Sequence, residues 1–304
     1  MWATAYSGLK RGTIYYNNGL ARMNAAKSIL QSQGLPYVVS AFTVVHGESN
    51  KYDSAATYKS YLEEWQSNLE TDSKLITGQT GSIPMFLCQL SSTTNTYSNP
   101  RVAIGQLAAA EANPTKIYLV TPKYIFDYVE TEQYIVHITG SASRRLGEYY
   151  GKVMKKVLID GDTWKPLSPS TISISANVIT VNFNVPVAPL QFDTIKVMST
   201  SNYGFEYFDS TNSATISSVA LGSNGTSILI TLSNIPTGSN KKIAYAYTNT
   251  ILPNNIGGGR YLVGSAKGNL RDSDTTPALY TNSLPNNMGT ELNNWCVTFI
   301  KDIN

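Results

Sequence analysis

The sequence predicts an α/β protein: a three-layer α/β domain with a parallel sheet, followed by an antiparallel β-sandwich domain. Its 304 residues suit two domains, at one domain per roughly 100–200 residues. Up to about residue 160, segments with the 3.6-residue period of helices alternate with short apolar runs, as in β/α units. Beyond residue 170, short segments of alternating polarity separated by turn signals follow, which is typical of a sandwich.

Three apolar runs in the first part predict buried strands at residues 37–45, 83–88 and 116–120. Strands that are apolar throughout and separated by helices pair in parallel and are covered on both faces. Ligands of such sheets bind beyond the carboxyl ends of the strands. The loops at residues 46–52, 89–100 and 121–140 are therefore the expected site of function.

Helical periodicity predicts four helices between and after these strands, at residues 17–33, about 54–69, 101–112 and 141–157. Gly34 and Pro36 end the first helix. Ser54 or Asp53 can cap the second, whose apolar stripe consists of Tyr58, Leu62, Trp65 and Leu69.

The composition changes around Trp164–Pro169, which predicts an α/β domain over residues 1–160, a linker over 161–170 and the sandwich over 171–304. A long loop rich in Asn, Gly, Pro and Ser is expected at about 252–290. The predicted strands of the sandwich are 171–175, 178–184, 194–198, 204–208, 216–221, 227–233, 242–247 and 295–300.

Composition excludes several classes of protein. Only 14% of residues are charged and 42% are hydrophobic, which argues against a disordered polyelectrolyte or a coiled coil. A net charge of +3 is too small to predict a nucleic-acid partner.

No signal peptide is recognised, and the absence of a long apolar run predicts no membrane span. The cysteines, Cys88 and Cys296, are expected to be buried free thiols, and with only two histidines neither a metal nor a cofactor is expected.

The block His46-Gly47-Glu48-Ser49-Asn50 follows the first predicted strand. Polar residues around a glycine at a strand-to-helix turn suit an oxyanion or acid–base site, because glycine lets the backbone approach a substrate. The alternative is a plain turn in which Glu48 or Asn50 caps the next helix.

His137 precedes the last predicted helix at the same edge of the sheet. A neutral imidazole in such a loop is well placed to act as a general base. A structural role is the alternative. Both histidines of the chain fall in loops at the functional edge, which favours the catalytic interpretation.

At these blocks the chain resembles the SGNH/GDSL hydrolase superfamily, in its sialate O-acetylesterase and acetylxylan-esterase-like branch, which has a flavodoxin-like three-layer fold. The resemblance covers residues 9–167, through His46–Asn50, residues 83–90 and the helix after His137. It implies a serine nucleophile, His137 as the base and an oxyanion hole that together remove acetyl groups from sugars. Glu48 or His46 would then orient the base or contact substrate, and Gly47 and Asn50 would line the oxyanion side.

The chain departs from the family at two points. The family's nucleophile block precedes everything matched here, so the α/β domain is expected to lack its first strand. Tyr134 stands where the family has an aspartate. Ser49 is a candidate nucleophile because Gly47–Asn50 also resembles the family's nucleophile block, and Ser7 is a further candidate. Otherwise the nucleophile comes from another polypeptide, or the domain is inactive.

The C-terminal part, from residues 257–260 through 268–273 to 294–299, is similar to the ends of bacteriophage virion proteins. This resemblance implies a tail or fibre protein located in the extracellular phage particle. Its partners would be host surface polysaccharide, other virion proteins and further copies of itself. Two hypotheses follow: a virion carbohydrate O-acetylesterase, or a catalytically inactive structural or receptor-binding virion protein that keeps the esterase fold.

Overall fold

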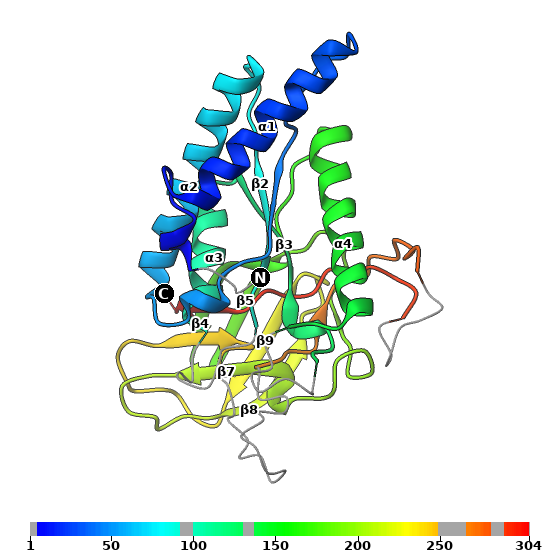
Figure 1. Ribbon diagram of the computed structural model, residues 1–304. Helices are drawn as coiled ribbons and strands as arrows, with labels where there is room; N and C mark the ends of the chain where they lie inside the picture. Colours follow the sequence, from blue (N-terminus) through cyan, green and yellow to red (C-terminus); the bar gives the residue numbers. More distant parts are fainter. Residues whose placement is uncertain (1–4, 92–99, 130–136, 249–265, 281–288, 304) are drawn as a thin grey trace.

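The computed structural model describes residues 5–91, 100–129, 137–248, 266–280 and 289–303. Figure 1 shows helices α1, α2 and α3 on one side of a small sheet and α4 on its other side, with antiparallel strands below them. The helices are α1 (Ile14–Ser32), α2 (Ala55–Thr77), α3 (Arg101–Ala112) and α4 (Gly140–Met154). A turn of π-helix, Lys155–Ile159, extends α4.

The sheet between these helices consists of β1 (Phe42–Val44), β2 (Met85–Gln89) and β3 (Ile117–Pro122), all parallel and in the order β1-β2-β3. Every residue of β2 and β3 is buried. This confirms the predicted parallel sheet. β1 is shorter than the predicted strand at 37–45, because the side-chain amide of Gln79 pairs with the backbone N–H and C=O of Val39 at 2.9 and 3.0 Å.

Helix α2 begins beside its predicted cap but runs to Thr77, beyond the predicted end at about residue 69. The Ser54 hydroxyl accepts a hydrogen bond from the Thr57 N–H at 3.0 Å, as predicted for an N-cap. Gly78 ends the helix in the left-handed conformation, with φ of 80°. Tyr58 and Leu62, from the predicted stripe, are each 1% exposed and hold the helix against the core.

The rest of the chain forms antiparallel sheets. One has the order β4-β5-β9-β8 and another the order β12-β10-β7, with a short pair β11-β6. Their bounds are β4 (Ser168–Ser175), β5 (Val178–Asn184), β6 (Gln191–Phe192), β7 (Phe205–Phe208), β8 (Ile216–Leu221), β9 (Ser227–Leu232), β10 (Lys242–Tyr245), β11 (Leu270–Arg271) and β12 (Phe299–Asp302). Phe183 of the first sheet and Phe299 of the second meet edge to face at 6.3 Å, in agreement with the predicted sandwich.

One predicted strand is wrong. Residues 194–198 form a turn, because a carboxylate oxygen of Asp193 accepts hydrogen bonds from the N–H groups of Ile195 and Lys196 at 3.0 and 2.8 Å. In the predicted loop at 252–290, Leu270 and Arg271 form β11, while residues 249–265 and 281–288 lie outside the described residues.

The helical layers and the antiparallel strands share one continuous core. The predicted linker contributes to it, since Trp164 and Leu167 are 7% and 0% exposed and β4 begins at Ser168. The side-chain amide of Gln89 bonds both the N–H and the C=O of Thr298, at 2.7 and 2.8 Å. The predicted division into two domains therefore stays a prediction.

Two further sequence predictions concern cysteines and membranes. Cys88 and Cys296 are free and fully buried, as expected. Burial raises the pKa of Cys88 to about 11. Among the described residues, no helix combines the length and apolar character needed to cross a bilayer.

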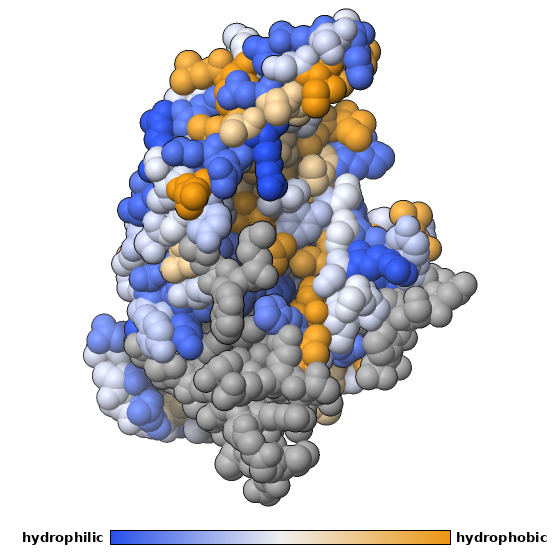
Figure 2. Space-filling view, in the orientation of Figure 1, coloured by the Kyte–Doolittle hydropathy of each residue, from blue (hydrophilic) through white to orange (hydrophobic). Residues whose placement is uncertain are grey.

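The sheet has an open side at β1, which is hydrogen-bonded to a single neighbouring strand among the described residues. Val38 and Val45, which flank β1, are 63% and 56% exposed. Figure 2 shows apolar surface gathered in a strip between the α1 side and α4. An apolar edge of this kind is a surface on which a further strand can pair.

Candidate active site

The site begins at the turn that follows β1. Gly47 has φ of +133° and is buried. A Cβ atom there would lie 2.7 Å from Val102, 2.8 Å from Leu90 and 2.9 Å from the Tyr58 hydroxyl. Glycine is thus required by the packing of α2, α3 and β2 around the turn. Its predicted place on the oxyanion side stays a prediction.

Glu48 forms a buried ion pair with Lys123, which belongs to no recognisable sequence motif. Its Oε1 lies 2.6 Å from the Nζ of Lys123, which directly follows β3, and the two side chains are 16% and 2% exposed. Burial lowers the pKa of Lys123, but its charge interactions with Tyr128 and Glu48 outweigh burial and raise that pKa above its ordinary value. The pair joins the carboxyl ends of β1 and β3. The predicted role of Glu48 in orienting a histidine stays a prediction.

His46 packs against α2. Its Nδ1 lies 2.8 Å from the hydroxyl of Tyr58, and that hydroxyl donates to the His46 carbonyl oxygen at 3.0 Å. Since the single hydroxyl proton is used on the carbonyl, Nδ1 acts as the donor to Tyr58. Trp65 contacts the imidazole edge to face at 5.4 Å. These contacts fix the ring at the carboxyl end of β1.

Asn50 and Ser49 complete the turn, in the short helix η2 (Glu48–Asn50). Asn50 is 5% exposed; its Oδ1 accepts from the Tyr6 N–H at 3.0 Å and its Nδ2 donates to Asp53 at 2.6 Å. Its side chain therefore links the N-terminal turn η1 (Tyr6–Gly8) to the site. Ser49 is exposed.

His137 is exposed and lies three residues before the start of α4 at Gly140. Its carbonyl oxygen accepts from the Val129 N–H at 2.9 Å, and Tyr128 and Ile138 form an antiparallel bridge. Thr139 caps α4 by accepting from the Ala142 N–H at 3.2 Å. His137 is thereby attached to the segment that follows β3 and Lys123. Tyr134, in the family's aspartate position, lies outside the described residues.

The structure adds three polar residues to the site: Lys123, Ser91 and Tyr128. Ser91 follows β2, is 3% exposed, and its hydroxyl lies 2.7 Å from that of Tyr128. Lys123 Nζ lies 5.9 Å from the centre of the Tyr128 ring. Each of the three lies in a loop predicted to be functional, but no motif marked it. Their positions after β2 and β3 are the signal that could have identified them.

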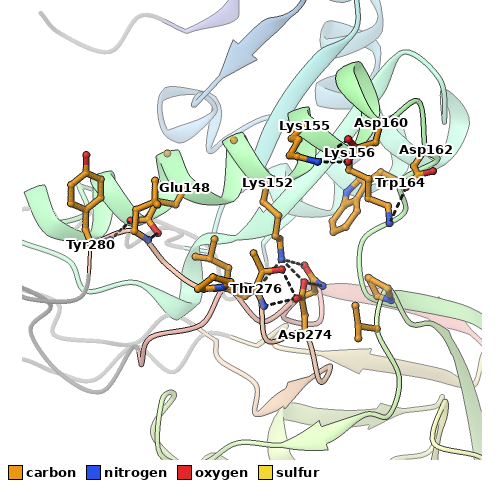
Figure 3. A pocket seen from close by; sticks show the side chains of 18 of the residues that line it. Glu148, Lys152, Lys155, Lys156, Asp160, Asp162, Trp164, Asp274, Thr276 and Tyr280 are labelled. Atoms are coloured by element: carbon orange, nitrogen blue, oxygen red, sulfur yellow. Dashed lines mark hydrogen bonds and ion pairs between the residues drawn. The ribbon is translucent and has the colours of Figure 1, made fainter.

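A concave region lies between α4 and the C-terminal segments. Its volume is about 740 Å³, within the range of ligand sites. Figure 3 shows Glu148 and Lys152 of α4, with Lys155 of the π-helical turn, along one side and Asp274, Thr276 and Tyr280 along the other. No group of acidic, histidine and cysteine residues suited to a metal occurs among the described residues.

Comparison with known proteins identifies the fold. No family model and no curated protein matches the chain. Among solved structures it is similar to a carbohydrate acetylesterase from Xanthomonas citri, with a TM-score of 0.53 and 13% identity over 86% of this chain and 49% of that enzyme. The chain has an esterase-like fold. It spans about half the length of that enzyme. An S-layer protein also matches, but with a TM-score of 0.20.

Proposed function

We propose that this chain carries the histidine-bearing part of a carbohydrate O-acetylesterase, in a bacteriophage tail or fibre protein that acts on host surface polysaccharide. The esterase-like fold supports the reaction class. The observation that carries the proposal is the buried pair of Glu48 and Lys123, which holds the turn after β1 beside the end of β3. The resemblance of the C-terminal part supports the virion location.

In the proposed mechanism His137 is the general base. It takes the proton of a serine hydroxyl while the serine oxygen attacks the acetyl carbonyl carbon. The sugar oxygen then leaves with that proton, and water hydrolyses the acetyl-serine to release acetate. The turn around Gly47 and Asn50 lies on the oxyanion side, and His46 contacts the substrate.

The nucleophile is Ser49 or a serine of another polypeptide. Ser49 is exposed in the turn after β1, where a substrate can reach it. The open edge of β1, with Val38 and Val45 exposed, supports the second source, since a strand that pairs there would end beside the same turn.

Release of acetate from p-nitrophenyl acetate and from acetylated polysaccharide tests the proposal, with and without the product of the neighbouring reading frame. We expect turnover, a loss of about 10²–10⁴-fold in His137→Ala, and no change in Leu75→Ala, an exposed residue near the end of α2. Ser49→Ala separates the two sources of the nucleophile. Absence of turnover under both conditions would refute the enzymatic proposal, and turnover that survives His137→Ala would refute the base.

The second hypothesis is a catalytically inactive receptor-binding virion protein. The concave region beside α4 favours it, because Tyr280 is 51% exposed on its wall and Arg144 lies 4.8 Å from the centre of its ring. Aromatic faces of this kind stack on sugar rings. Polysaccharide binding without turnover, weakened in Tyr280→Ala, would establish this function in place of the first.

A further inference from the structure

A closed cluster of polar side chains joins α4 to the C-terminal segment. The Nζ of Lys152 lies 2.6 Å from Oδ1 of Asn294 and 2.9 Å from Oδ2 of Asp274. The Nδ2 of Asn294 donates to the same Oδ2 of Asp274 at 3.1 Å and to Oδ2 of Asp272 at 2.7 Å. One carboxylate oxygen of Asp274 thus contacts both the amine and the carboxamide nitrogen. Figure 3 shows Lys152 directed from α4 toward Asp274.

The cluster is almost fully removed from solvent. Asp272, Asn294 and Asp274 are 0%, 5% and 9% exposed. The aromatic ring of Tyr149 lies 5.3 Å from the Lys152 amine. The Lys152 side chain is 13% exposed, so the carboxamide is buried while the amine lies at the border between the cluster and the concave region beside α4.

Lys152 donates to three oxygen acceptors, since the Leu292 carbonyl oxygen also lies 2.5 Å from its Nζ, and the amine must lose a proton before it can react. Burial lowers the pKa of Lys152 below its ordinary value, although Asp274 and Asp272 act in the opposite direction. A lowered pKa increases the fraction of neutral amine, which is the nucleophilic form.

Asp274 and Asp272 have different hydrogen-bond partners and therefore different proposed roles. Thr276 donates its N–H and its hydroxyl to Oδ1 of Asp274, at 2.8 and 2.6 Å. This leaves Oδ2 directed at Lys152 and Asn294. Asp272 accepts from the backbone N–H and the side-chain amide of Asn294, at 2.9 and 2.7 Å, and so fixes the orientation of the carboxamide.

We propose that Lys152 and Asn294 form an intramolecular isopeptide bond. The lone pair of Nζ attacks Cγ of Asn294, the Nζ–Cγ bond forms and the Cγ–Nδ2 bond breaks. Oδ2 of Asp274 takes a proton from Nζ and passes it to Nδ2, which leaves as ammonia. No oxidant or other reactant is needed. The chain loses about 17 Da, the mass of one ammonia molecule.

The bond would close a loop across much of the chain. Lys152 and Asn294 are 142 positions apart. A covalent link over such a distance restricts the unfolded chain, as a disulfide does, but without dependence on redox conditions. It would fasten α4, which follows His137, to the segment that leads into β12.

The test is the intact mass of the folded full-length chain, measured after denaturation and reduction. We expect a mass about 17 Da below that of the sequence, and a tandem spectrum that joins the peptides containing residues 152 and 294. Lys152→Met and Asn294→Ala should have full sequence mass. Asp274→Asn should also have full mass while its circular dichroism stays native. Lys155→Met, the next lysine along the helix, is the matched control and should keep the deficit.

Each contrary result overturns a defined part of the proposal. Wild-type protein at full sequence mass, after prolonged incubation in the folded state, excludes the bond and leaves only an ion pair. A deficit that persists in Lys152→Met arises from ammonia loss elsewhere, such as succinimide formation, and also refutes the bond. A deficit that persists in folded Asp274→Asn refutes the proton transfer by Asp274.

Discussion

Replacing Glu48 by glutamine should destabilise the protein strongly, because it leaves the charge of Lys123 buried without its counter-ion. The two charged atoms lie 2.6 Å apart, and the lysine side chain is 2% exposed. At an effective dielectric constant near 20, an attraction of about 6 kcal/mol acts over such a distance. Desolvation of both ions opposes it. Removal of one partner of a buried pair costs about 3–5 kcal/mol, and we expect a loss in this range for Glu48→Gln.

The assay is unfolding in urea or guanidinium chloride, with a double-mutant cycle through Lys123→Met and the double variant. The double variant should be more stable than the sum of the two single effects predicts. The matched control is Asp160→Asn, which breaks the exposed pair with Lys155, whose side chains are 38% and 63% exposed. That loss should stay below about 1 kcal/mol.

The pKa of Lys123 determines how the loss of stability in Glu48→Gln depends on pH. Its pKa is raised in the folded state, so the stability it contributes is fully present below the ordinary value of 10.5 and is lost only as pH rises through the higher folded value. The loss in Glu48→Gln should therefore be constant between about pH 6 and pH 9. A loss under about 1 kcal/mol, or effects that add without coupling, would refute the assignment of a buried, interacting pair.

Three other regions give predictions of their own. Gly47→Ala should lower the free energy of unfolding by more than about 2 kcal/mol, since both the backbone φ of Gly47 and its neighbours oppose a Cβ atom. Gly78→Ala, with open space around the residue, should lower it by about 1 kcal/mol. Equal losses in the two variants would contradict the packing argument. Cys88 and Cys296 are fully buried and should react with a thiol reagent only at the rate of unfolding, and rapid reaction of the native protein would disprove their burial. Burial raises the pKa of Glu70, but hydrogen bonds to a lysine and a glutamine outweigh burial and hold that pKa at about 2. The stability of the protein should therefore fall as pH drops from 4.5 toward 2. If the stability of Glu70→Gln fell equally steeply over this range, the assignment would be refuted.

Local sequence signals predicted the presence and order of the four helices because their causes are local, although α2 runs to Thr77 and not to the predicted end near residue 69. Ser54 caps the start of α2, and Tyr58 and Leu62, only a few residues further along the chain, define its buried face. Thr194–Met198 shows the limit of such signals. Its alternating polarity suits a strand, but the carboxylate of Asp193 binds the backbone N–H groups that a ladder would need.

The site could be predicted only in part for a related reason. The block at His46–Asn50 and the position of His137 are recognisable in the sequence. Lys123, the partner of Glu48, lies 75 positions further along the chain and belongs to no motif. Only the order of the strands brings the two together, since β1 and β3 are separated in the sheet by β2 alone. Lys123 can be recognised as the partner of Glu48 only when the strand order β1-β2-β3 is known.

The C-terminal segment connects the antiparallel strands to the loops of the candidate site. Gln89, at the end of β2, bonds the backbone of Thr298 as a neighbouring strand would. Tyr124, next to Lys123, donates its hydroxyl to the carbonyl oxygen of Cys296 at 2.6 Å. Residues 296–298 are thus hydrogen-bonded to Gln89 and Tyr124 at the carboxyl ends of β2 and β3. The loops of the candidate site follow these ends. The antiparallel strands are accordingly part of the framework that positions the ends of β2 and β3.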